Sequence, residues 1–151
     1  MISRILEPEV MDDPAEVIAY DAMDFSDVNQ DFANLVVATH LQSEAMVLDL
    51  GTGTARIPIF VAQQRSQWQI IATDLAPSML EVGQKNVDAA DCTSQIQLQL
   101  ADSKNLSFGD RHFDLIVGHR RDVSRFRTIR RDHAAAVIGN QQPPESAIGV
   151  A

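Results

Sequence analysis

The sequence contains a single cysteine, Cys92, and no long uninterrupted apolar run. One cysteine provides neither a disulfide framework nor a cysteine-based zinc site, and no apolar run reaches the roughly 20 residues that span a bilayer. The opening residues, 1–7, lack the apolar centre of a signal peptide. These absences predict one cytoplasmic domain with no membrane segment and no bound metal. The length of 151 residues is enough to bury a hydrophobic core.

Basic residues are scarce in the first part of the chain. Residues 1–31 contain nine carboxylates and a single arginine, and the net charge of the whole chain is −9 at pH 7. This balance disfavours a general nucleic-acid surface, because such a surface must attract phosphates. Within the acidic segment, Asp13 and Pro14 predict a short helix over residues 13–20. Apolar residues at helical spacing predict a second helix over residues 27–40.

Residues 46–56, MVLDLGTGTAR, read as an apolar strand that carries one acid, Asp49, and runs into a glycine-rich turn. Gly51 and Gly53 permit positive φ and let a ligand approach the main chain without meeting a Cβ. Residues 57–64 predict a helix whose unpaired N-terminal amides point back at this turn. A strand, a tight turn and a helix N-terminus in this order predict a nucleotide-type site.

The turn departs from the patterns of two common nucleotide sites. A dinucleotide fingerprint has a third glycine where this chain has Arg56, and no Gly-Lys-Ser/Thr follows as in a phosphate loop. An ordinary strand–helix turn without a ligand stays open as an alternative. The observed order, Asp49-x-Gly51-x-Gly53-x-Ala55, resembles motif I of the class I S-adenosylmethionine-dependent methyltransferases. In that motif an acid ends the first strand and the third glycine is often replaced by alanine.

Two further acids follow predicted strands. The apolar run 70–73 predicts a second parallel strand that ends at Asp74, and residues 95–100 predict a half-exposed edge strand that is followed by Asp102. Ligands of such sheets bind at the carboxyl ends of the strands, where Asp74 could accept both hydrogens of a ribose diol. The alternatives are a helix N-cap for Asp74, which would not exclude the ribose role, and an ordinary surface loop for Asp102.

The resemblance to the methyltransferases extends over roughly residues 27–117. Residues 74–80, DLAPSML, match the segment that follows motif I and open a predicted helix over 77–90, and residues 113–117, FDLIV, resemble the fourth strand. The resemblance implies a Rossmann-like α/β fold, with a parallel sheet of order 3-2-1-4 built by right-handed crossovers, and S-adenosyl-L-methionine as the cofactor. It also implies a set of cofactor-binding residues, in which the acid after the third strand accepts a hydrogen bond from the adenine amino group. The set is Asp49, Gly51, Thr52, Gly53, Asp74, Leu75, Met79, Asp102 and Ser103.

In the resembled family the segment before motif I often lies near the cofactor, which would make Tyr20 and Asp21 part of a lid. We favour a solvated acidic face with a core-facing tyrosine. The predicted organisation is an acidic helical segment (1–41), a cofactor-binding core (42–118) and an Arg-rich, Pro-broken tail (119–151).

The resemblance stops after residue 117. Residues 119–133 hold six of the twelve Lys and Arg residues, and a short apolar stretch, 134–138, precedes a polar end. Two or three more α/β units of about 30 residues each do not fit in what remains. The tail is therefore a truncated or frame-shifted end, a divergent cap or, least favoured, a phosphate-binding segment. No catalytic residue is identified, and His119, the histidine nearest the predicted site, reads as a surface residue.

A sheet that ends at its fourth strand would leave residues 114–117 on a free edge. Such an edge predicts dimerisation or aggregation through this strand, and the isolated chain is expected to be a poor methyltransferase or none. The predicted function is S-adenosylmethionine-dependent methyl transfer to an unidentified acceptor, with a small molecule favoured. The alternatives are a catalytically incompetent cofactor-binding remnant or interaction module, and an NAD-type oxidoreductase fragment, which Asp49 and Arg56 disfavour.

Overall fold

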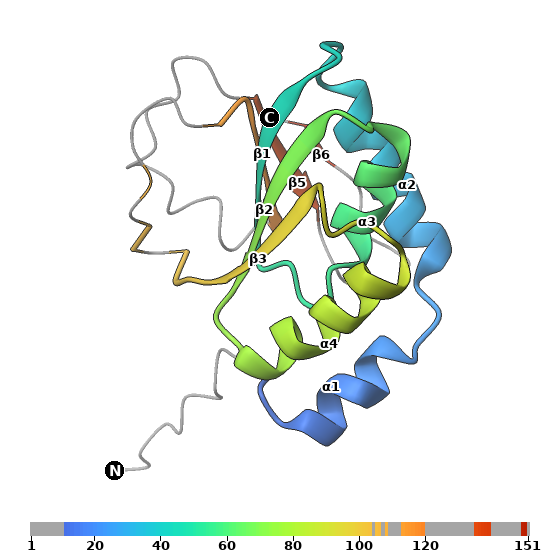
Figure 1. Cartoon of the computed structure of the whole chain (residues 1–151), viewed down its shortest axis with the longest axis vertical. Helices are drawn as coiled ribbons and strands as arrows, with labels where there is room; N and C mark the ends of the chain where they lie inside the picture. The colour runs from blue at the N-terminus through green and yellow to red at the C-terminus, as the bar shows by residue number, and fades with distance from the viewer. Residues whose placement is uncertain are drawn as a thin grey trace.

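The computed structural model describes residues 11–103, 105–106, 108, 113–119, 135–139 and 149–150. In this part of the chain one mixed sheet carries all the strands, and the helices lie together on one of its faces (Figure 1). The elements in chain order are α1 (Pro14–Asp21), α2 (Ser26–Ala38), β1 (Ala45–Leu50), α3 (Arg56–Gln64), β2 (Trp68–Asp74), α4 (Pro77–Ala89), β3 (Ile96–Leu100), β4 (Leu115–His119), β5 (Ala135–Gly139) and β6 (Gly149–Val150). None of the described helices is long and apolar enough to cross a membrane.

The sheet has the strand order β3-β2-β1-β4-β5-β6. β1 lies inside it and pairs in parallel with β2 and with β4, so that Val47 is opposite both Ile70 and Leu115. β3 pairs in parallel with the outer side of β2. The predicted parallel order 3-2-1-4 is therefore confirmed, and it brings the carboxyl ends of β1, β2 and β3 to the same edge of the sheet.

The prediction that the fourth strand forms a free edge is wrong. β5 pairs in parallel with β4 over the whole of residues 115–119, and β6 pairs antiparallel with β5. The physical reason is that the apolar stretch 134–138 is long enough for most of one strand, β5. Sequence reasoning had counted the remaining chain in complete strand–helix units, and so excluded a strand that needs only five residues.

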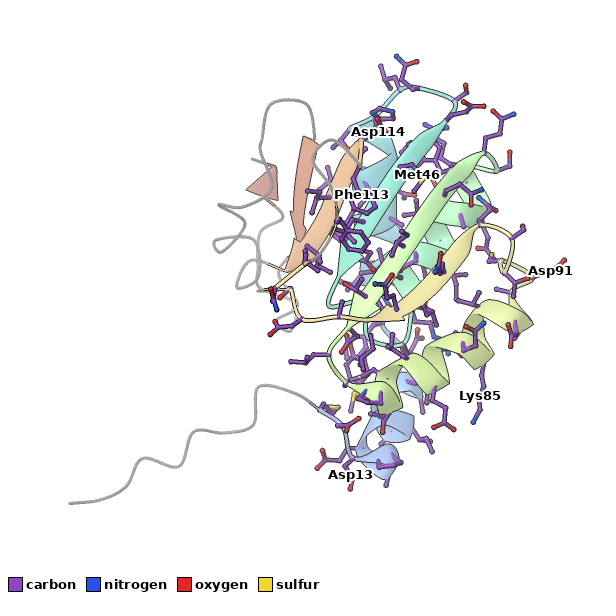
Figure 2. The ribbon with its side chains drawn as sticks, turned by 60° about the vertical axis from the view of Figure 1, so that its left-hand side comes forward. Asp13, Met46, Lys85, Asp91, Phe113 and Asp114 are labelled. Carbon is purple, nitrogen blue, oxygen red and sulfur yellow. The ribbon has the colours of Figure 1, made fainter. Side chains whose placement is uncertain are left out.

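The two faces of the sheet are covered differently. Side chains alternate along β1, so Val47 joins the core under the helices whereas Leu48 and Leu50 join a smaller cluster on the opposite face. Phe113 packs into that second cluster and lies against the sheet in Figure 2. Trp68 is fully buried in the core under the helices. The larger hydrophobic core therefore lies between the sheet and the helices.

The predicted start of α1 is confirmed. Asp13 accepts hydrogen bonds from the amides of Ala15 and Glu16, and Pro14 occupies the first helical position. Val17 of α1 is fully buried against Ala76 and Met79 at the start of α4. This contact places the acidic N-terminal segment next to the carboxyl end of β2.

Candidate functional site

The glycine-rich turn bends through left-handed backbone conformations. Gly51 has φ 68° and Gly53 has φ 60°, as their residue type allows. Ala55 also has a positive φ, 64°, which a side chain makes unfavourable. The amide of Thr52 donates to the carbonyl of Thr73 at 2.8 Å. The turn thus continues the pairing of β1 with β2 for one more hydrogen bond before α3 begins.

Asp74 ties this turn to the end of β2. Its Oδ2 accepts a hydrogen bond of 2.8 Å from the amide of Gly53, and its Oδ1 accepts one of 2.9 Å from the amide of Ala76. A carboxylate offers about four lone-pair sites, so each oxygen keeps capacity for a further donor. The alternative that Asp74 is the N-cap of α4 is wrong, because Ala76 holds that position without a side-chain capping hydrogen bond. The ribose role of Asp74 stays a prediction.

Asp49 lies under the turn, in the interior of the sheet. Only 6% of the residue is exposed. Burial, together with the negative charge of Asp74, raises the pKa of Asp49 to about 7, although the Thr52 hydroxyl and the Leu50 amide oppose the rise. This carboxyl group therefore titrates near neutral pH, which sets it apart from an ordinary aspartate.

The remaining predicted site residues lie near the ends of β2 and β3. The amide of Ala101 donates to the carbonyl of Asp74 at 3.0 Å, which brings the segment carrying Asp102 and Ser103 beside Asp74. Leu75 is 45% exposed at the end of β2. Met79 is buried, and a Cβ built on Gly53 would lie 3.9 Å from its Sδ. The predicted residues are thus brought to one edge of the sheet.

A cavity of about 300 Å³ lies on another side of the turn. Its walls are Thr52, Thr54 and Arg56 from the turn and α3, Phe60 from α3, and residues 20–26 from the N-terminal segment; Asn29 and Ile57 complete it. Of the predicted site residues, only Thr52 lines it. Thr52 therefore links the predicted site to a cavity that sequence reasoning did not identify.

The favoured interpretation of the acidic segment as a solvated face is wrong for Asp21. Its carboxylate pairs with Arg56 through two hydrogen bonds, of 3.0 and 2.9 Å. Although burial opposes it, hydrogen bonds from Arg56, Thr54 and Asn86 hold the pKa of Asp21 below its usual value. Tyr20 does face the small cluster of α1 and α4, as expected. The segment therefore lies beside the turn, and its role as a lid over the cofactor stays a prediction.

Sequence reasoning did not place Thr54, Arg56, Asn86 or Phe60 at the site. A partial signal existed, because Arg56 stands where a dinucleotide fold would have a glycine, directly after the turn. Asn86 lies three helical turns into α4, and nothing in its local sequence indicates a contact with the turn. His119 ends β4, and its side chain lies outside the described residues.

The residues present fit a cofactor of the kind that the sequence predicts. Thr52 Oγ1 is buried and has no hydrogen-bond partner of standard geometry among the described residues, although it is close enough to Asp49 to oppose the rise in the pKa of that carboxyl group. Beside it, both glycines of the turn have the positive φ that leaves the main chain uncovered. Asp74 keeps acceptor capacity at the neighbouring strand end. The turn thus offers an unsatisfied polar group, open main chain and a carboxylate within one edge of the sheet.

Comparisons with known proteins agree with this arrangement. Residues 47–138 match the family model described as a methyltransferase domain. The chain is 37% identical over 79 residues to a release factor glutamine methyltransferase of Cereibacter sphaeroides, an alignment of 52% of this chain and 28% of that protein. It is 34% identical over 80 residues to a demethylmenaquinone methyltransferase of Symbiobacterium thermophilum, covering 52% of this chain and 32% of the relative. The chain thus spans about a third of the length of these relatives.

Solved structures share the fold. A SAM-dependent methyltransferase from Aquifex aeolicus superposes with a TM-score of 0.70 at 16% identity, covering 92% of this chain and 78% of the other. A candidate S-adenosyl-L-methionine-dependent methyltransferase from Methanococcus maripaludis gives 0.75 at 22% identity, with coverages of 90% and 67%.

The family match reaches residue 138 and includes most of β5, so it extends past residue 117, where the sequence resemblance stopped. Since it covers more than half of the chain, and the sheet order and glycine turn agree with it, the identity of the domain follows. The chain belongs to the Rossmann-like methyltransferase domain family, which uses S-adenosyl-L-methionine as its cofactor.

Proposed function

We propose that this chain binds S-adenosyl-L-methionine at the carboxyl ends of β1, β2 and β3, and that it serves methyl transfer to a small molecule in the cytoplasm. The observation that carries the proposal is the hydrogen bond from the Gly53 amide to Asp74. It joins the open main chain of the turn to a carboxylate at the next strand end, which is the arrangement a nucleoside with an extended tail requires. Residues 42–118 form the cofactor-binding core in this proposal.

Each predicted residue has a role that its position supports. The free acceptor sites of Asp74 would receive the ribose hydroxyls, with charge assistance. Gly51, Thr52 and Gly53 would border the tail of the cofactor. Asp102 and Ser103 would border its adenine, while Leu75 and Met79 supply apolar contact. Asp49 is buried within β1, so it would support the turn from beneath.

The cofactor, when bound, supplies an electrophilic methyl group on a sulfonium centre. The chain's own contribution is to hold the reacting partners in line and to exclude water. We assign no general base. An acceptor atom that is anionic or carries no hydrogen has no proton to lose on methylation, whereas a hydroxyl or N–H acceptor would release its proton to solvent.

The size of the cavity supports a small-molecule acceptor. At about 300 Å³ it lies at the lower end of the range for small-molecule sites. The names of the relatives do not decide the matter, since they include methyltransferases of demethylmenaquinone and of release factor glutamine. Phe60 and the loop after α1 would then border the acceptor.

Calorimetric titration with S-adenosylhomocysteine and, separately, with NAD tests the proposal. We expect saturable binding of S-adenosylhomocysteine and none of NAD. Binding of NAD instead would favour the dinucleotide alternative and overturn the assignment. Transfer of a labelled methyl group to a panel of small acceptors then separates an enzyme from a cofactor-binding module, which would bind the cofactor without turnover.

A further inference from the structure

Asp21, the last residue of α1, connects three elements around the glycine turn. Its two carboxylate oxygens accept hydrogen bonds from Nε and Nη2 of Arg56, the first residue of α3. Asn86 of α4 donates to the same carboxylate at 3.0 Å. The pair is bidentate and charge-assisted, the stronger geometry for an arginine and a carboxylate.

Asn86 also reaches the turn itself. Its side-chain amide donates at 3.0 Å to the carbonyl of Thr54, between the second glycine and Ala55. One amide group therefore bonds both the turn and Asp21. A displacement of Asp21 therefore changes the contacts of Asn86, which donates to the Thr54 carbonyl of the turn.

The surroundings make this ion pair more consequential than a surface pair. The side chain of Asp21 is only 14% exposed, whereas that of Arg56 is 46% exposed. Exposed ion pairs contribute little, but partial burial of the acid and a second donor from Asn86 raise its contribution. Two of the five N–H donors of Arg56 are used by Asp21, and the side chain borders the cavity.

The described part of the N-terminal segment is also anchored away from Asp21. α1 docks through the small cluster of Val17, Ala76 and Met79, and Ser78 bonds Asp12 just before the helix. Residues 20–26 then form one wall of the cavity, opposite Thr52 and Thr54. Asp21 is one point at which this wall is fixed to the other, because it bonds Arg56 of α3 and Asn86 of α4.

We propose that Asp21 is a positioning residue of the ligand site: through Arg56 and Asn86 it fixes the glycine turn and holds residues 20–26 over it, so that docking of α1 and ligand binding at the turn are coupled. The identity of the ligand rests on the proposed function, but the coupling does not. A ligand that contacts the turn stabilises the docked form of α1. By the same coupling, loss of docking lowers the affinity for the ligand by the same factor.

The test compares Asp21→Asn, Arg56→Gln and the double variant, with Glu16→Gln as the matched control. Glu16 is an exposed acid on α1 outside the network, so its substitution removes the same charge from the same helix. The readouts are amide hydrogen exchange of residues 14–26 without ligand, and the Kd for S-adenosylhomocysteine. Arg56 is the more exposed partner, so Arg56→Gln is the milder change and keeps the test available if Asp21→Asn does not fold.

We expect faster exchange over residues 14–26 and an approximately tenfold weaker Kd in each single variant, as befits one charge-assisted pair. The double variant should lose no more than either single variant, because both remove the same interaction. Glu16→Gln should match the wild type in both readouts.

Two results would overturn the proposal: unchanged exchange and Kd in the single variants, or additive losses that reach about a hundredfold in the double variant, which mark independent residues. A wild-type chain that does not bind S-adenosylhomocysteine would contradict the proposed function instead. In that case exchange in the ligand-free variants still decides whether Asp21 holds α1.

Discussion

The two ends of the sheet are built in opposite ways. At the carboxyl ends of the strands, the backbone adopts positive φ at Gly51, Gly53 and Ala55, and a buried acid lies beneath the turn. At the amino ends, Trp68 is fully buried and donates through Nε1 to the carbonyl of Gln42. Strained backbone tends to persist where a function requires it. The contrast indicates that one end serves a ligand while the other holds the fold.

The amino end is also tied by long-range contacts. Asp114, just before β4, accepts a hydrogen bond of 2.8 Å from the amide of Met46 in β1, and Figure 2 shows both residues at the end of the sheet away from Asp13. Gln95 donates to the carbonyls of Arg65 and Trp68. One buried donor at this end is left without a hydrogen bond among the described residues, namely Nε of Arg65. Its guanidinium lies 5.7 Å from the centre of the Trp68 ring, where a cation–π contact compensates in part.

The largest effect is expected at the amino end. Trp68→Ala should lower the free energy of unfolding by about 3–5 kcal/mol, because it empties a fully buried aromatic site. Denaturant unfolding measures this loss. The Kd of the folded variant for S-adenosylhomocysteine should stay within about twofold of the wild-type value. If Trp68→Ala does not fold, Trp68→Phe is measured in its place. A selective loss of affinity with normal stability would break the comparison.

At the carboxyl end, Asp49→Asn should change how stability depends on pH. Since the folded-state pKa of Asp49 is about 7 and its ordinary value is 3.8, the folded chain holds this proton more tightly than the unfolded chain. Its contribution to stability is therefore fully present below pH 4 and is lost as the pH rises through 7, by up to about 4 kcal/mol. The asparagine variant should gain in stability relative to wild type by a similar amount between pH 4 and pH 8.

Unfolding curves across that pH range provide the measurement. Asp27→Asn, an exposed acid of α2, is the control and should run parallel to the wild type. Parallel curves for Asp49→Asn as well would show that the carboxyl group under the turn titrates like a surface acid.

Asp74→Ala should weaken S-adenosylhomocysteine binding about ten- to a hundredfold, or 1.5–3 kcal/mol, through loss of a charge-assisted contact. The substitution also removes the acceptor for the Gly53 and Ala76 amides. Asp74→Asn keeps one acceptor oxygen, so its affinity should fall between those of the wild type and Asp74→Ala. Calorimetry that finds an unchanged Kd in the alanine variant would remove the ribose assignment.

Gly53→Val tests whether the turn must stay open. The structure leaves room for a Cβ, with Met79 Sδ as the nearest atom at 3.9 Å, but φ is +60°. An L-residue there costs about 1–2 kcal/mol, and the side chain covers main chain that a ligand would approach. We expect a lower melting temperature together with loss of binding, and Gly53→Ala should lie in between. Wild-type affinity in Gly53→Val would mean that the turn is only a structural link.

The smallest effect is expected at Ala55, and with the opposite sign. Ala55→Gly relieves an unfavourable φ of 64° and should stabilise the chain by up to about 1 kcal/mol. Ala62→Gly, in the ordinary helical backbone of α3, is the matched control and should destabilise by about 1 kcal/mol. Thermal unfolding of the pair measures the difference. Destabilisation of similar size in both variants would show that Ala55 carries no strain.

Sequence reasoning located the carboxyl end of the sheet because its signals are local. The glycine turn, Asp74 after an apolar run and Asp102 after an alternating one are each visible within a few residues, and parallel topology then brings them together. The order 3-2-1-4, which the family resemblance and right-handed crossovers implied, is confirmed. The strand ends were predicted within a few residues, with β2 beginning at Trp68, two residues earlier than expected.

The contacts that sequence reasoning missed are long-range. Asp21 and Arg56 are 35 positions apart, and Asn86 is 65 from Asp21; the local sequence of each residue is compatible with an exposed helix position. β5 was missed for another reason, since five apolar residues after an Arg-rich stretch carry no periodicity that separates a strand from a loop. Pairing with β4 decides its structure, and pairing cannot be read from the segment alone.

Titration of an ¹⁵N-labelled sample with S-adenosylhomocysteine reports both ends of the sheet in one experiment, through the chemical shifts of the backbone amides. If the carboxyl end binds the ligand, the large shift changes gather at Gly51, Gly53, Asp74 and Asp102, while the amide signals of Met46 and Trp68 do not move. Changes centred on the amino end around Trp68, or no changes at saturating ligand, would contradict binding at the carboxyl end.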